Sequence, residues 1–154
     1  MNDVTADIEV TGQAIPRFSR REISAFTRSV LLALERLDKL EDEITSVTIA
    51  FVDDDAMTEL NQKFRKKART TDVLTFPADD SYNEPNASGR PLGDIVISVD
   101  QAKRQAVDEK HALATEIRYL LVHGVLHALG YDHEADHGEM NALELQVREL
   151  VTLV

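Results

Sequence analysis

One short segment, residues 123–133, places three histidines around a glycine and constrains the local fold more than any other part of the chain. His123 and His127 stand four residues apart, so on a helix they share one face. Gly130 follows, and glycine enters the left-handed conformation at a helix C-terminus without steric cost. The segment therefore predicts a helix that ends at Gly130 and a turn that brings His133 back towards the first two imidazoles.

Three imidazoles at this spacing predict a catalytic metal site, because they leave one position of a tetrahedral metal open. The chain has no cysteine, which excludes disulfides and limits metal ligands to nitrogen and oxygen. Four of the five histidines lie within fifteen residues, which favours a metal site over two partly buried polar side chains. We predict one metal ion per chain, with zinc as the best choice and nickel or copper as alternatives. The predicted ligands are His123, His127 and His133.

The histidine spacing is similar to the metzincin protease signature, H-E-x-x-H-x-x-G-x-x-H, with one large departure. The glutamate of that signature serves the proteases as general base, and Gly124 occupies its position in this chain. The chain therefore keeps the predicted metal ligands of such an enzyme and lacks its proton carrier. This difference counts against a peptidase.

Length and composition predict an ordinary globular protein. The 154 residues predict a single domain, residues 1–154, and a hydrophobic content of 43% is enough for a core. The first residues contain neither a basic start nor an apolar run, and no apolar segment approaches the ~20 residues of a membrane span. We therefore expect a cytoplasmic protein that does not associate with membranes.

The pattern of apolar residues predicts an α+β domain, with helices packed on a small mixed sheet of four strands. Apolar and β-branched segments predict the four strands near residues 8–10, 46–52, 72–77 and 94–99. Residues 79–91 predict a long loop between two strands that flank a substrate cleft. The predicted helices are one from the capping box Ser19–Glu22 to about Leu40, one capped by Asp54 or Asp55, one capped by Asp100, the histidine helix over 111–129, and a last helix with Met140, Leu143, Val147, Leu150 and Val154 on one face.

A basic run interrupts an otherwise acidic chain. The net charge is −11, which is unfavourable for nucleic-acid binding by the chain as a whole. A local basic patch can nevertheless hold a phosphate backbone, whereas the alternative is a solvated helix end whose cations complement the helix dipole. Charge alone leaves both interpretations open. The run contains Lys63, Arg65, Lys66, Lys67 and Arg69.

Three separate sequence segments carry a resemblance to a known family. They are LNQKFR (60–65) with TDVLTFP (71–77), LGDIVIS (92–98), and the histidine segment that ends in GYDH (130–133). Their order and spacing resemble the YbeY family, bacterial metal-dependent endoribonucleases of ribosomal RNA maturation, over residues 47–150. The resemblance implies a zincin-like fold with zinc on the three histidines, and a functional arginine at Arg65. Lys66 departs from the usual glycine, and Arg69-Thr70-Thr71 departs from the usual Lys-Pro-Thr.

The resemblance and the residues together predict a zinc-dependent endoribonuclease, a hydrolase that acts on single-stranded regions of ribosomal RNA precursors in ribosome biogenesis. The expected partners are RNA and the ribosomal subunit or its proteins. Zinc could lower the pKa of a bound water to ~7, and Arg65 could meet the developing negative charge of the phosphodiester with its planar fork of donors. The alternatives are a metallopeptidase-like hydrolase and a non-catalytic ribosome-assembly factor in which zinc fixes the fold.

The sequence does not identify the group that moves protons. Asp132, Glu134 and His137 lie near the predicted metal ligands in sequence, and nothing distinguishes one of them. Either Asp132 or Asp94 could instead orient a ligand histidine by accepting a hydrogen bond from its second ring nitrogen, although each could equally be an ordinary turn or cap residue.

Overall fold

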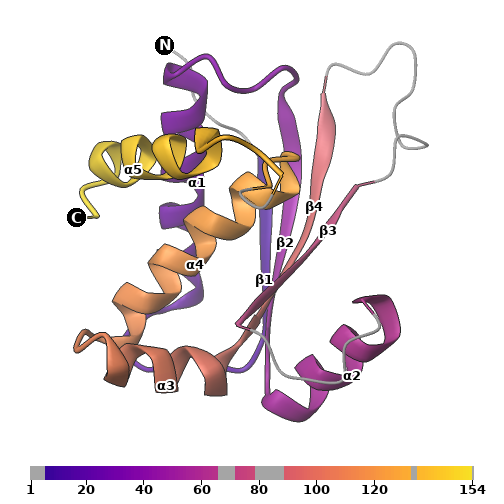
Figure 1. The fold of residues 1–154 in the computed structure, drawn as a ribbon, viewed down its shortest axis with the longest axis vertical. Helices are drawn as coiled ribbons and strands as arrows, with labels where there is room; N and C mark the ends of the chain where they lie inside the picture. Colours follow the sequence, from indigo (N-terminus) through magenta and orange to yellow (C-terminus); the bar gives the residue numbers. More distant parts are fainter. Residues whose placement is uncertain (1–5, 66–71, 79–88, 133–134, 154) are drawn as a thin grey trace.

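A four-stranded mixed sheet forms the centre of the molecule, as the sequence predicts (Figure 1). The computed structural model describes residues 6–65, 72–78, 89–132 and 135–153. The strand order is β1-β2-β4-β3, in which the first three strands are parallel and β3 pairs antiparallel with β4 at the edge. The strands are β1 (Asp7–Gly12), β2 (Ile44–Val52), β3 (Val73–Pro77) and β4 (Arg90–Ser98).

In the described part of the chain, five helices cover the two faces of this sheet unequally. Four of them lie on one face, whereas α2 alone lies on the other (Figure 1). None of the helices in the described ranges is long and apolar enough to cross a membrane. The helices are α1 (Arg20–Arg36), α2 (Asp54–Arg65), α3 (Val99–Asp108), α4 (Leu113–Ala128) and α5 (Glu139–Leu150).

The alternation of side chains along the strands divides the core between these two faces. Ile95 and Ile97 of β4 are fully buried in the large core under α1, α3, α4 and α5. Val96, between them, points to the opposite face and joins the smaller cluster that Met57 of α2 covers. This alternation fixes which side of each strand faces the histidine helix α4.

The structure confirms the predicted start of α1. The Ser19 hydroxyl accepts a hydrogen bond from the backbone N–H of Glu22 (3.1 Å), and the Glu22 carboxylate accepts one from the N–H of Ser19 (3.1 Å). Hydrogen bonding of the Glu22 carboxylate to Ser19, first to its backbone N–H and second to its hydroxyl group, holds the pKa of Glu22 below its ordinary value. The helix ends at Arg36, one turn before the predicted end at Leu40.

The predicted caps of α2 and α3 are wrong in an instructive way. Asp53, not Asp54 or Asp55, caps α2 by accepting from the N–H of Ala56 (2.8 Å). The hydroxyl of Ser98 caps α3, whereas Asp100 accepts from the N–H of Asp54 at the start of α2 (2.9 Å). The physical reason is that β2 and β4 are parallel neighbours, so the starts of the two helices that follow them lie side by side.

The start of β4 and the buried face of α5 also differ from the prediction. β4 begins at Arg90, four residues before the expected start, so it takes the last two residues of the predicted loop 79–91. Residues 79–88 lie outside the described residues, and this connection joins the antiparallel neighbours β3 and β4. On α5, the predicted residues Met140, Leu143 and Val147 are buried, whereas Leu150 is 47% exposed and Val154 lies outside the described residues.

Candidate metal centre

The helix α4 approaches the sheet closely at Gly124. A Cβ atom at this position would lie 2.8 Å from Cγ2 of Ile95 and 3.5 Å from Cγ2 of Val73. Ile95 is fully buried, so it has little room to move aside. The position that a protease would use for its general base therefore faces the sheet in this protein and has to be glycine for packing.

We expect Gly124→Ala to destabilise the protein. Overpacking against Ile95 costs about 1–3 kcal/mol, whereas the better helix propensity of alanine returns up to ~1 kcal/mol. Chemical denaturation should therefore show a net loss of roughly 1 kcal/mol in the free energy of unfolding. A gain in stability would show that α4 can move away from β4 without cost.

The predicted glycine stop at the end of α4 is confirmed. Gly130 adopts a left-handed φ of 103°, and its N–H donates to the carbonyl of His127 (2.9 Å). The N–H of Tyr131 donates to the carbonyl of Leu126 (3.1 Å). These two bonds form a Schellman motif, which satisfies the last carbonyls of the helix and turns the chain back.

Two of the three predicted metal ligands meet on one face of α4. The ring centroids of His123 and His127 lie 4.5 Å apart, with an angle of 65° between the ring planes. His133 lies outside the described residues. Within the described ranges no group of three histidine, cysteine, aspartate or glutamate side chains is placed to hold a metal. The three-histidine ligand set therefore stays a prediction.

Glu144 of α5 is a site residue that the sequence analysis missed. Its Oε1 lies 2.9 Å from Nδ1 of His123. A carboxylate oxygen only accepts, so Nδ1 carries the proton and Nε2 is the nitrogen whose lone pair a metal would use. Histidines that bind metals commonly donate their second ring nitrogen to a carboxylate in this way, so the pair fits a metal centre. The only sequence signal is that Glu144 follows Leu143 and stands four residues after Met140, at the border of the buried face of α5.

Asp94, which the sequence analysis considered for this orienting role, cannot fill it. It is exposed on β4, and its neighbour Ile95 is the residue that faces Gly124 of α4. Because side chains alternate along a strand, Asp94 lies on the opposite face of the sheet. The other candidate, Asp132, is exposed in the turn after α4, where its backbone carbonyl accepts from the N–H groups of Ala135 and Asp136, each at 3.1 Å.

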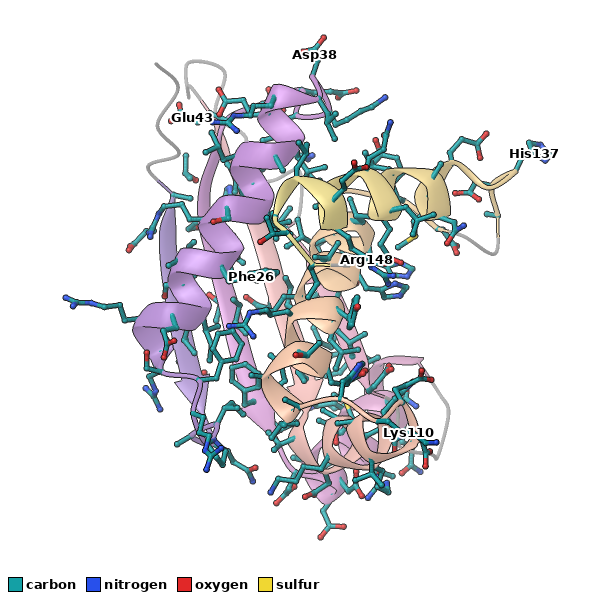
Figure 2. The ribbon with its side chains drawn as sticks, turned by 90° about the vertical axis from the view of Figure 1, so that its left-hand side faces the viewer. Phe26, Asp38, Glu43, Lys110, His137 and Arg148 are labelled. Carbon is teal, nitrogen blue, oxygen red and sulfur yellow. The ribbon has the colours of Figure 1, made fainter. Side chains whose placement is uncertain are left out.

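A hollow of about 420 Å³ opens beside His123, between α4 and the start of α5. The carboxylate of Asp136 holds the turn at the edge of this hollow, because it accepts hydrogen bonds from the N–H groups of Gly138 (2.9 Å) and Met140 (2.8 Å). His137, one of the three residues that the sequence leaves open as proton carrier, is exposed and points away from the molecule at the tip of this turn (Figure 2). Glu134, another, lies outside the described residues. The lining residues are His123, Asp136, Gly138, Met140, Asn141 and Glu144.

The predicted catalytic residue Arg65 is the last residue of α2, and its side chain is outside the described part of the structure. Its neighbour Phe64 packs edge to face on Phe76 of β3, with ring centroids 5.2 Å apart. The same edge strand contacts α4, where Val73 faces Gly124. The end of α2 and the histidine helix are thus held by opposite faces of β3. Of the basic run, Lys66, Lys67 and Arg69 lie outside the described residues.

The chain is similar in sequence and fold to several known proteins. The family model described as Endoribonuclease YbeY matches residues 8–152. A protein named Endoribonuclease YbeY from Nautilia profundicola is 42% identical over 122 residues, which cover 78% of this chain and 84% of the relative. Its namesake from Campylobacter jejuni is 39% identical over 129 residues, covering 80% and 92%. The solution structure of TM1509 from Thermotoga maritima is similar with a TM-score of 0.57 and 28% identity, covering 94% of this chain and 88% of that one.

Proposed function

The chain belongs to the YbeY family of endoribonucleases, and on that premise we propose that it cleaves single-stranded regions of ribosomal RNA precursors with one zinc ion per chain. The proposed zinc ligands are His123, His127 and His133. The observation that carries the zinc proposal is the bond between His123 Nδ1 and Glu144, because it directs the opposite ring nitrogen towards the site that His127 also borders. We also propose that the helix and turn form a zincin-like centre.

The residues of the chain would divide the chemistry as follows. When bound, zinc would supply Lewis-acid chemistry and lower the pKa of a water molecule to ~7. Arg65 would hold the non-bridging phosphate oxygens with two parallel N–H donors, a contact that strengthens as negative charge develops. We propose that an RNA strand would reach this centre through the hollow beside His123.

A metallopeptidase is disfavoured by the packing of α4. Gly124→Glu would place its side chain against Ile95, so this change is not expected to create a working peptidase. Robust hydrolysis of casein by the variant would show that the missing base alone separates this protein from a protease.

The experiment that tests the proposed function combines elemental analysis with cleavage of single-stranded RNA. We expect about one zinc per purified chain, and we expect a chelator to stop cleavage while circular dichroism shows a retained fold. Casein serves as the control substrate. Unfolding upon removal of the metal would instead favour a non-catalytic assembly factor. The proposed partners, a ribosomal subunit or its proteins, and the proposed cytoplasmic location follow from the role in ribosomal RNA maturation.

A further inference from the structure

The carboxylate of Glu144 has a second partner, which comes from its own helix. Its Oε2 accepts a hydrogen bond from Nη2 of Arg148 (3.0 Å), while Oε1 is engaged by His123. The side chain of Glu144 is only 12% exposed. Because each oxygen has a separate donor, the plane of the carboxylate is fixed, and with it the direction from which His123 Nδ1 is held.

Arg148 is in turn fixed by an aromatic ring on the opposite helix. Its guanidinium carbon lies 4.4 Å from the ring centroid of Tyr119, and Tyr119 stands four residues before His123 on the same face of α4. Figure 2 shows Arg148 between α5 and α4. A planar guanidinium can stack on the ring and donate to a carboxylate at the same time, whereas the ammonium of lysine cannot reproduce both contacts.

Two contacts hold the guanidinium of Arg148, namely the hydrogen bond from Nη2 to Glu144 and the stacking on Tyr119. Nε of Arg148 is buried and has no hydrogen-bond partner among the described residues. Among these residues, the position of the guanidinium is therefore set by Glu144 and Tyr119.

We propose that Arg148 and Tyr119 are positioning residues, which clamp Glu144 so that His123 keeps its proton on Nδ1 and presents Nε2 to the metal. The inference rests on the proposed zinc centre for its purpose, but the clamp acts on the His123 ring whether or not a metal is bound. It predicts an order of dependence, in which Tyr119 acts through Arg148, and Arg148 acts through Glu144.

The first test reads the tautomer of His123 in the metal-free protein. Long-range proton–nitrogen NMR spectra at a pH of about 8.5, well above the ordinary histidine pKa of ~6.5, distinguish protonation at Nδ1 from protonation at Nε2. We expect wild type to be almost entirely the Nδ1–H form and Arg148→Met to show a mixture. Arg104→Met is the matched control, because Arg104 forms its ion pair with Asp54 on α2 (2.8 Å) instead of with Glu144. An unchanged His123 tautomer in Arg148→Met would overturn the proposal.

The second test measures zinc affinity by competition with a chelator. Loss of a carboxylate that holds a metal-binding histidine costs at least ~10-fold in metal affinity, so we expect a loss of about 10-fold for Glu144→Gln. We expect a smaller loss of about 3-fold for Arg148→Met, because Arg148 acts through Glu144. Arg148→Lys should lie between wild type and Arg148→Met. The Arg148 effect should vanish when Glu144 is already glutamine. A loss that persists in the double variant would mean that Arg148 acts only by packing α4 on α5.

The two tests separate failure of the clamp from failure of the zinc centre. If wild type binds no zinc while the tautomer still depends on Arg148, the proposed zinc chemistry is wrong and the clamp stands. If wild type binds zinc while neither tautomer nor affinity responds to Arg148, only the clamp is wrong. Thermal unfolding of the metal-free variants shows whether a change of overall stability accompanies either result.

Discussion

Replacing His127 with alanine should remove bound zinc and RNA cleavage together. His127 lies on the last turn of α4, one turn after His123, and its ring borders the same site. With one of three imidazoles absent, too few protein ligands remain for a tight site with an open position. We expect less than about a tenth of the wild-type zinc content after dialysis, measured by elemental analysis, and no cleavage above background.

The matched control for this prediction is His137→Ala. His137 is exposed and directed away from the molecule, so its loss should leave zinc content unchanged (Figure 2). Circular dichroism should show that both variants are folded, because the backbone bonds of the Gly130 turn do not involve either imidazole. Full zinc occupancy in His127→Ala would refute the proposed ligand set.

The features that the sequence predicts correctly are those that depend on neighbouring residues. The capping box at Ser19 and the glycine stop at Gly130 require only a few residues and their backbone geometry, and both are present in the structure. The apolar alternation that predicts four strands is local in the same sense. These signals place His123 and His127 on one helix face, and they therefore predict the start of the candidate site.

The features that the sequence misses depend on contacts between distant segments. Glu144 meets His123 only because α5 folds back on α4, and no spacing rule links residues that lie so far apart. Asp100 binds the start of α2 for a related reason, since the register between β2 and β4 brings two helix starts together. The reason for a glycine at position 124 also lies in the tertiary structure, because a Cβ atom there would come too close to Ile95 of β4.

Replacing Arg65 with lysine should slow cleavage greatly and leave zinc content and RNA affinity nearly unchanged. Lysine keeps the positive charge, so long-range attraction to phosphate survives. It loses the planar fork, so the contact that strengthens in the transition state is weakened by roughly 2–4 kcal/mol, which corresponds to a rate loss of about 30- to 1,000-fold. Single-turnover cleavage rates, measured beside RNA binding, report the two effects separately.

Neutralising Lys66 and Lys67 together is the matched comparison, because these residues follow Arg65 directly in the basic run. If the run only attracts the RNA backbone, this double change should weaken binding and flatten its salt dependence, while Arg65→Lys should be almost silent. If Arg65 acts on the reacting phosphate, Arg65→Lys should slow cleavage more than the double change does, whereas the double change should still weaken RNA binding more than Arg65→Lys does. Measuring both variants at two salt concentrations decides between these outcomes, and wild-type turnover in Arg65→Lys would end the catalytic role proposed for Arg65.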